Sequence, residues 1–342
     1  MNETILVTGS QGFIGTYICQ ELLNNNYNVI GVDNFSKYGK LTRGHDTHPN
    51  FKFYEEDCSK NDFLDRLKDV TFDYIIAGAA MIGGIAYFHK YAYDLIATNE
   101  RIIANTFDLA LQRFNKGELK KILVLSSSMV FENTIKWPSL ESDIDICPPP
   151  SSTYGFQKLA CEFFAKGAFE QYGLPYTIVR PFNCIGVGEE ESISEHEVTS
   201  GNIKLNLSHV VPDLILKCLK DQDPFRIFGS GNQIRHYTNG LDIARGIRIC
   251  LEHPNALNND FNISSPISTT VIELAEMIWK KINPAKPFQF ESDKPFEYDV
   301  EKRIPSVSKA KELLGFETKI NLSDSLDEVI TWMKKKELKN LE

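Results

Sequence analysis

Short apolar or β-branched runs alternate with segments of helical periodicity through the first half of the chain. Apolar runs between turn residues predict strands, and apolar residues that recur every three or four positions predict helices. The predicted strands are Thr4–Thr8, Tyr27–Val32, Phe51–Tyr54, Tyr74–Ala77, Lys121–Ser126 and Tyr176–Arg180. The predicted helices between them are Phe13–Asn24, Phe63–Lys68, Tyr93–Phe114 and Thr153–Gln171. Because strands and helices alternate, we expect an α/β fold built on a doubly wound parallel sheet.

The pattern is less regular after Pro181. The acidic, serine-rich stretch Gly188–Gly201 is expected to be an exposed loop. Beyond it the predicted strands are Phe225–Phe228 and Phe261–Ile263, and the predicted helices are Leu207–Lys220, Gly240–Leu251, Thr270–Lys281, Ser308–Leu314 and Ser323–Lys334. We therefore expect two interleaved domains: the large sheet from residues 1–182 and 237–264, and a smaller α/β domain from residues 183–236 and 265–342.

Composition excludes several classes of protein. The 342 residues are 42% hydrophobic and 24% charged, with a net charge of −9, so neither nucleic acid nor an anionic membrane is expected as a partner. Seven scattered cysteines without a C-x-x-C pair indicate a reduced, cytoplasmic protein with no disulfide framework. The N-terminus lacks the basic and apolar regions of a signal peptide, and the weakly polar stretch Ile75–Phe88 is too short to cross a membrane.

A glycine-rich turn follows the first predicted strand. Gly9, Gly12 and Gly15 stand between that strand and a helix, with Gln11, Phe13 and Ile14 between and beside them. Glycines in this arrangement let backbone amides approach a pyrophosphate at the helix N-terminus. Asp33 ends the second strand, where its carboxylate can bond the ribose hydroxyls of an adenosine and repel a 2′-phosphate. The turn therefore predicts a dinucleotide site that prefers NAD to NADP, and Asp57 is either an adenine contact or an ordinary turn residue.

A second constellation combines serine, tyrosine and lysine. The fifth strand ends in three serines, 126 to 128, and a helix beginning near Ser152 would place Tyr154 and Lys158 on one face. A phenol with a pKa near 10 is a poor base at neutral pH, so a tyrosine base needs a neighbouring cation that favours the phenolate. A serine hydroxyl can bond the substrate oxygen that exchanges the proton. These residues predict acid–base chemistry beside the cofactor.

Over nearly its whole length the chain resembles the extended short-chain dehydrogenase/reductase family, which includes nucleotide-sugar epimerases and dehydratases. The matching segments include Thr8–Gly15, the triple serine, Tyr154 with Lys158, Arg180–Gly186, Gly229–Tyr237 and Lys302–Ala310. The resemblance implies a Rossmann domain that binds NAD, and a smaller domain that binds a nucleotide-diphosphate sugar. In this family the active hydroxyl lies four residues before an aromatic residue, which implies Ser127 as the catalytic serine, together with Tyr154 and Lys158.

The resemblance also implies the binding residues and an assembly. The implied cofactor contacts are Gly9, Gln11, Gly12, Phe13, Ile14, Gly15, Asp33, Asn34, Asp57, Cys58, Ala79, Ala80, Asn99, Tyr154, Lys158 and Pro181. The implied substrate contacts are Met81, Ser128, Asn183, Arg235 and Arg303, of which Asn183 and the two arginines would lie near the phosphates. A homodimer is implied through the helices predicted at 93–114 and 153–171.

Departures from the subfamilies narrow the reaction. Dehydratases carry an acidic pair directly after the catalytic serine or threonine, where this chain has Ser128 and Met129. Members that epimerise C3 and C5 need a proton-transferring cysteine at Met129, and a thioether transfers no proton. Epimerisation at C4 through a 4-keto intermediate needs only the serine, tyrosine and lysine with NAD, so it is the favoured reaction. Net oxidation or reduction, decarboxylation and dehydration stay open as alternatives on the same scaffold.

Two other hypotheses fit the residues less well than a catalytic NAD site. A non-catalytic NAD sensor of this fold would be expected to lose Tyr154 or Lys158, and both are present. His45, His48, Glu189–Glu191 and His196 are clustered in polar loops without the spacing that holds a metal, so no metal is expected. A structural role is expected for His236.

Overall fold

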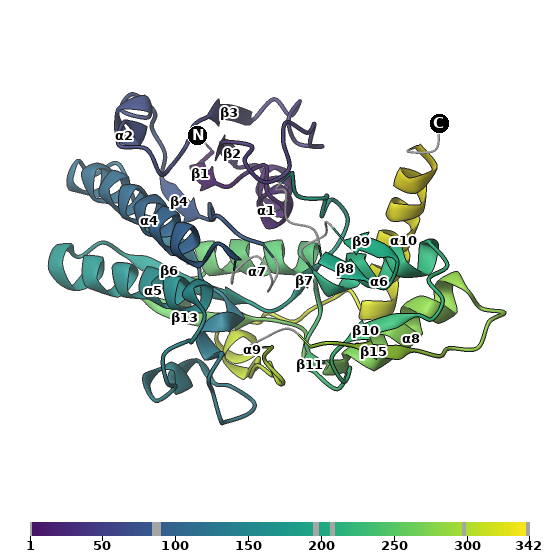
Figure 1. Ribbon diagram of the computed structural model, residues 1–342. Coiled ribbons are helices and arrows are strands. Elements are labelled where there is room, and N and C mark those ends of the chain that lie inside the picture. Colours follow the sequence, from purple (N-terminus) through teal and green to yellow (C-terminus); the bar gives the residue numbers. More distant parts are fainter. Residues whose placement is uncertain (1, 84–89, 194–197, 206–208, 296–298, 340–342) are drawn as a thin grey trace.

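The computed structural model describes residues 2–83, 90–193, 198–205, 209–295 and 299–339. Its centre is a seven-stranded parallel sheet in the order β13-β6-β5-β4-β1-β2-β3 (Figure 1). The strands of this sheet are β1 Thr4–Thr8, β2 Asn28–Asp33, β3 Phe51–Glu55, β4 Tyr74–Ala77, β5 Lys121–Leu125, β6 Tyr176–Pro181 and β13 Asn259–Ile263. The helices are α1 Phe13–Asn24, α2 Phe63–Arg66, α4 Ala92–Asn115, α5 Thr153–Tyr172, α6 Val210–Leu219, α7 Gly240–Glu252, α8 Val271–Ile282, α9 Ser308–Leu314 and α10 Leu322–Lys339. The expected doubly wound α/β fold is confirmed.

Each face of the sheet has its own apolar core, because successive side chains of a strand point to opposite faces. In β1, Ile5 and Val7 pack with α1 and α7, whereas Leu6 packs with α4 and α5 on the other face. All three side chains are fully buried. A continuous apolar strand is what a parallel sheet covered on both faces requires.

A third core joins the elements that follow the sheet. It is formed by α6, α8 and α10 together with β10 Arg226–Phe228, and it contains Leu214, Ile227, Leu274 and Ile330. Short two-stranded ladders surround it, and their remaining strands are β7 Cys184–Ile185, β8 Val198–Ser200, β9 Ile203–Leu205, β11 Ile234–Arg235, β12 Thr238–Asn239, β14 Thr269–Thr270 and β15 Glu291–Asp293. Late in the chain, Ala310 and Leu314 of α9 return to the core that contains β1. The exact division into two domains stays a prediction.

Part of the stretch from 188 to 201 differs from expectation, although Glu191 and Ile193 are exposed as expected. It was expected to be an exposed loop, yet Glu189 and Ser200 are buried, and the strands β8 and β9 pair as an antiparallel hairpin. Its backbone is held by distant residues: Ile193 N–H donates to Lys37 O, and the Arg43 guanidinium donates to Gly188 O. An acidic, serine-rich composition indicates solvent exposure only when no such partners exist, and those partners lie about 150 positions away in the sequence.

The other predicted elements are found with shifts at their ends. The largest extension is in α10, which was predicted at Ser323–Lys334 and runs from Leu322 to Lys339. β13 begins two residues earlier than predicted, at Asn259, and its Asp260 pairs with Arg180 and Lys309. Of the helix predicted at 207–220, the structure describes α6 from Val210, and residues 206–208 lie outside the described residues. Within the described part of the chain, no helix is long and apolar enough to cross a membrane.

Candidate active site

One large cavity, of about 720 Å³, opens at the carboxyl ends of the sheet strands. Its walls come from the turn after β1, the ends of β2, β4 and β5, the start of α5, and then from α6, β10 and β11. Ligands bind at this edge of open α/β sheets, because the loops that follow parallel strands converge there. The cavity therefore spans both the sheet and the smaller apolar core.

The turn after β1 is a backbone cradle that only glycine fits. Gly9 has a φ of +75°, and a Cβ on it would lie 2.9 Å from the backbone of Ala79. A Cβ on Gly15 would lie 1.9 Å from Gly9 O, so the first turn of α1 packs directly on the glycine turn. The N-cap of α1 is Gly12, and no side chain caps the helix, which leaves its first amides directed toward the cavity. This arrangement fits a pyrophosphate group.

Asp33 is held in one orientation at the end of β2. Its carboxylate accepts hydrogen bonds from the backbone N–H of Gln11 at 3.0 Å and of Phe35 at 2.8 Å. Burial raises the pKa of Asp33, and these two bonds and the nearby Arg43 guanidinium oppose that rise. Sequence reasoning did not identify Arg43 as a neighbour of Asp33. Two nitrogens of the Arg43 guanidinium donate, to Gln11 O at 2.9 Å and to Gly188 O at 3.2 Å, and its Nε is buried without a hydrogen-bond partner among the described residues.

The loop after β4 is supported from two sides. The Thr8 hydroxyl accepts hydrogen bonds from the backbone N–H groups of Gly78 and Ala79, both at 3.1 Å. The buried Asn99 amide bonds both backbone groups of Met81, at 2.7 and 3.0 Å. Asn99 therefore positions Met81 in the cavity wall, and its direct contact with a cofactor stays a prediction. Asn34, Asp57, Cys58, Ala79, Ala80, Met81 and Pro181 line the cavity.

Ser127, Tyr154 and Lys158 meet in this cavity. The Ser152 side chain caps α5 by accepting from Gly155 N–H, and it donates in turn to Glu132 at 2.7 Å, which fixes the start of the helix. One turn apart on α5, Tyr154 and Lys158 are 7% and 6% exposed, and Lys158 Nζ lies 6.0 Å from the centre of the Tyr154 ring. The same Nζ donates to Leu125 O at 2.9 Å. The predicted four-residue spacing thus places Tyr154 and Lys158 in the same site as Ser127.

Beyond Tyr154 the wall is cationic. Arg235 and Arg303 both line the cavity, and Arg235 is paired with Asp299 at 2.9 Å. Arg303 Nε is buried and has no hydrogen-bond partner among the described residues. Burial, reinforced by the neighbouring Arg235 charge, lowers the pKa of Arg303 to about 9, so the site favours a bound anion. Asn183 lies beside them with its amide bonded to His236 O.

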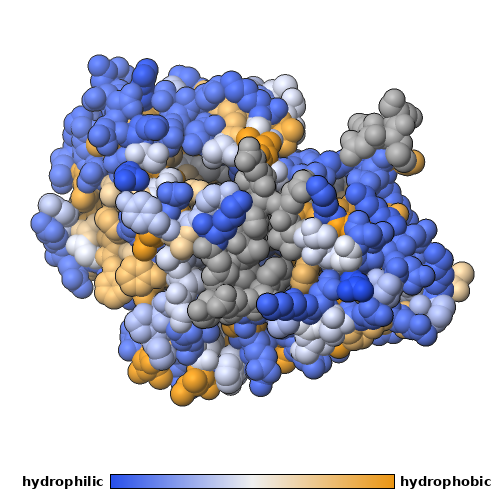
Figure 2. Space-filling view, in the orientation of Figure 1, coloured by the Kyte–Doolittle hydropathy of each residue, from blue (hydrophilic) through white to orange (hydrophobic). Residues whose placement is uncertain are grey.

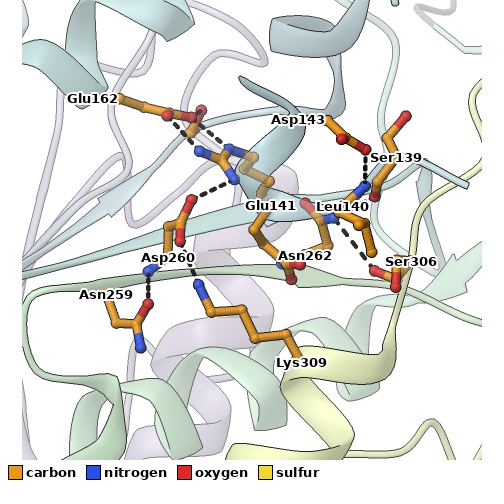
Figure 3. Close-up of polar contacts among 12 residues, drawn as sticks. Ser139, Leu140, Glu141, Asp143, Glu162, Asn259, Asp260, Asn262, Ser306 and Lys309 are labelled. Atoms are coloured by element: carbon orange, nitrogen blue, oxygen red, sulfur yellow. Dashed lines mark hydrogen bonds and ion pairs between the residues drawn. The ribbon is translucent and has the colours of Figure 1, made fainter. Parts of the chain in front are cut away.

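A network of buried charges lies behind the catalytic strand end, and sequence reasoning missed it. Glu162 follows Lys158 by one helical turn and accepts two hydrogen bonds from Arg180, at 2.7 and 2.6 Å. Arg180 also pairs with Asp260 at 2.7 Å, and Asp260 pairs with Lys309 at 2.6 Å (Figure 3). Ser126, adjacent to Ser127, donates to Glu162 at 2.5 Å. The Tyr154–Lys158–Glu162 spacing was the available signal, because positions i, i+4 and i+8 share one helix face.

The groups that resembled metal ligands do not form a cluster. Among the described residues, no three histidine, cysteine, aspartate or glutamate side chains are arranged to hold a metal ion, and His196 lies outside them. His236 is buried, with Nδ1 bonded to Ser265 O and Nε2 bonded to the Ser268 hydroxyl, both at 2.8 Å. These contacts are those of a structural histidine.

Comparisons with known proteins agree with this geometry. Residues 5–264 match the model of the NAD dependent epimerase/dehydratase family. A putative UDP-glucose 4-epimerase of Methanocaldococcus jannaschii is 29% identical over 332 residues, which are 96% of this chain and 98% of that protein. The crystal structure of UDP-glucose 4-epimerase from Thermotoga maritima with UDP-glucose superposes with a TM-score of 0.82 at 28% identity, over 97% of this chain and 99% of that one.

A second solved structure shows two ligands. It is the UDP-glucuronic acid 4-epimerase of Bacillus cereus in complex with UDP-glucuronic acid and NAD, with a TM-score of 0.80 and 26% identity over 97% of this chain and 99% of that one. The family model spans most of the chain, including the glycine turn and the serine, tyrosine and lysine. The protein therefore belongs to the NAD dependent epimerase/dehydratase family.

Proposed function

We propose that the protein is an NAD-dependent epimerase that inverts C4 of a UDP-sugar through a 4-keto intermediate. The observation that carries the proposal is the meeting of Ser127, Tyr154 and Lys158 in one cavity with the glycine turn on one side and Arg235 and Arg303 on the other. Bound NAD supplies reversible hydride transfer at the sugar carbon. The relatives named above, which act on UDP-glucose and UDP-glucuronic acid, support UDP as the nucleotide.

The protein's own residues hold the cofactor and move the proton. The glycine turn and the amides of α1 bind the pyrophosphate of NAD, and Asp33 bonds the adenosine ribose. Tyr154 takes the proton of the 4-hydroxyl, and the Lys158 ammonium lies beside it, with Nζ 6.0 Å from the centre of the Tyr154 ring. Ser127 bonds the same substrate oxygen and steadies it during the transfer. Arg235 and Arg303 bind the diphosphate, which leaves the keto sugar free to turn over in the cavity.

The residues after Ser127 favour epimerisation over dehydration. Ser128 and Met129 form part of a short 3-10 helix, Ser128–Phe131, and both line the cavity. Neither side chain is an acid that could protonate and expel the hydroxyl at C6. The proposed reaction uses only the groups that the cavity presents.

An isotope experiment tests the reaction. A UDP-hexose labelled with deuterium at C4 should keep its label in the C4 epimer, because the hydride removed from C4 returns to the same carbon. UDP-glucose and UDP-glucuronic acid are the substrates to compare. Steady NADH accumulation would instead identify a net oxidoreductase, and release of CO2 from UDP-glucuronic acid would identify a decarboxylase. Either outcome would overturn the proposal.

We further infer a homodimer in the cytoplasm. The outer faces of α4 and α5 expose Tyr93, Phe156, Phe163 and Phe169, and an apolar patch lies over these helices (Figure 2). Large apolar groups on two adjacent helices favour burial against a second copy. Light scattering at micromolar concentration should give twice 38.8 kDa, and Phe163→Glu should return the monomer mass. All seven cysteines are free, which supports a reducing compartment.

A further inference from the structure

An acid and a base that the reaction does not use line the far end of the cavity. Asp213 and Lys217 lie one turn apart on α6, and both line the cavity. Asp213 Oδ1 is buried and has no hydrogen-bond partner among the described residues. A buried carboxylate oxygen without a donor costs free energy unless a ligand supplies one. Sequence reasoning missed both residues.

A chain of contacts orders the cavity wall from the reacting tyrosine to this pair. Arg303 interacts electrostatically with Tyr154 and Arg235, and Arg235 is paired with Asp299. Gln233 then donates to Asp299 at 2.8 Å and to Phe228 O at 3.4 Å. Lys217 Nζ lies 4.6 Å from the centre of the Phe228 ring. In space, the order along the wall is therefore the proposed proton-transfer group, the two arginines proposed to bind phosphate, an aromatic residue and the acid–base pair.

A UDP-sugar has the same order of chemical groups: sugar, diphosphate, uridine. With the sugar at Tyr154 and the diphosphate at the arginines, the base reaches Phe228, Lys217 and Asp213. Lys217 Nζ donates to Arg226 O at 2.8 Å, and an ammonium has two further N–H donors. Uracil presents an N3–H donor beside the O4 acceptor. The pair offers the complementary acceptor and donor.

We propose that Asp213 is a specificity-determining residue that accepts the imide N3–H of the uracil base, with Lys217 donating to the adjacent carbonyl. This inference rests on the proposed function for the orientation of the substrate. Cytosine presents a bare N3 and an amino group at the same positions, so its N3 lone pair faces the carboxylate and its amino group faces the ammonium. Bound cytosine would lose both hydrogen bonds and would also leave the buried polar groups of Asp213 and Lys217 unpaired. Both effects favour the binding of uracil over cytosine.

Calorimetric titration with UDP and CDP tests the assignment, since neither ligand needs turnover. The wild type should bind UDP at least ~100-fold more tightly than CDP. Asp213→Asn should narrow that ratio at least ~10-fold, because an amide can turn to donate to a bare N3. Asp221→Asn is the matched control: it removes one negative charge just beyond the same helix, where Asp221 is exposed and paired with Lys286, and should leave the ratio unchanged. NAD binding reports that each variant is folded.

A ligand-side measurement keeps the test independent of the variant's folding. UDP methylated at N3 lacks the donor and should bind wild-type protein at least ~10-fold more weakly than UDP. Methylation of N3 should weaken the binding of UDP less in the Asp213→Asn variant than in the wild type. An unchanged UDP-to-CDP ratio in a folded Asp213→Asn protein, or equal binding of methylated and unmethylated UDP by the wild type, would overturn the role of Asp213. Failure of the wild type to epimerise any UDP-sugar, with the base preference intact, would overturn the proposed function alone.

Discussion

Two sets of buried charges in this protein differ in how completely they are paired. Behind the catalytic strand end, Arg180 forms ion pairs with Glu162 at 2.6 Å and with Asp260 at 2.7 Å, and both Arg180 and Glu162 are fully buried. Along the cavity wall, Arg303 Nε and Asp213 Oδ1 are buried without a partner among the described residues. Burying charge is costly, so a buried charged atom in a cavity wall that lacks an internal partner is suited to contact a ligand. The paired set serves the fold and the unpaired set serves the ligand.

The largest effect is expected at the cavity. Tyr154→Phe keeps the ring and its packing but removes the ionisable oxygen, so turnover should fall by ~10²–10⁴. The thermal midpoint and NAD binding should be unchanged. Tyr172→Phe, an exposed tyrosine at the end of the same helix, is the control and should keep full turnover. Near-normal turnover of folded Tyr154→Phe would remove Tyr154 from the mechanism.

Within the same cavity, Ser127→Ala should lose less turnover than Tyr154→Phe. The substitution removes one hydrogen bond to the substrate oxygen and leaves the base in place, so a loss of roughly 10-fold to 100-fold is expected. Steady-state kinetics of the two variants on one UDP-sugar gives the ranking. A loss for Ser127→Ala that equals or exceeds that for Tyr154→Phe would contradict the assigned roles.

The paired network should respond in stability. Glu162→Gln leaves the fully buried Arg180 with one carboxylate instead of two, which should lower the free energy of unfolding by about 3–5 kcal/mol. Urea unfolding measures the change. Glu276→Gln breaks an exposed pair with Lys280 and should cost less than ~1 kcal/mol. Equal losses for the two variants would show that burial does not distinguish these pairs.

Lys121 is an intermediate case, a buried cation whose hydrogen-bond partners among the described residues are neutral carbonyl groups. Its Nζ donates to Cys250 O and Leu251 O at the end of α7, and burial lowers its pKa to about 8. The unfolded chain, with an ordinary lysine pKa near 10.4, then binds more protons than the folded protein between pH 8 and 10, so this lysine makes stability rise with pH in that window.

Comparison with Lys121→Met isolates this contribution. The unfolding free energy of the wild type should gain ~1–2 kcal/mol relative to the variant between pH 8 and pH 10. Urea midpoints of both proteins at the two pH values provide the measurement. Parallel pH profiles for the two proteins would show that Lys121 titrates as it does in the unfolded chain.

The smallest effect is expected in the choice of cofactor. NAD should bind at least ~10-fold more tightly than NADP, because the 2′-phosphate would face the Asp33 carboxylate while the Arg43 guanidinium is already used by two carbonyls. Asp33→Ser should reduce the difference in affinity between NAD and NADP. Calorimetry that shows equal or tighter binding of NADP to the wild type would contradict this account.

Much of the fold could be predicted from local pattern. Ile5, Leu6 and Val7 form a strand apolar on both faces, and a strand with two buried faces implies a covered parallel sheet. The glycine turn and the Tyr154–Lys158 spacing are equally local, since each depends on a few adjacent residues and on the geometry of one turn or one helix. Their convergence in one cavity followed from the rule that the loops of parallel strands meet at one edge.

The sequence by itself therefore determined the doubly wound sheet, the glycine turn and the common face of Tyr154 and Lys158. Only the tertiary structure decided that Arg43 lies beside Asp33, that Glu189 in the acidic stretch is buried, and that Arg180 stands between Glu162 and Asp260. It also left Asp213 Oδ1 without a hydrogen-bond partner among the described residues. The physical reason is that charges are costly to bury and their partners here come from distant parts of the chain, so composition and spacing near each residue carry no record of the pairing.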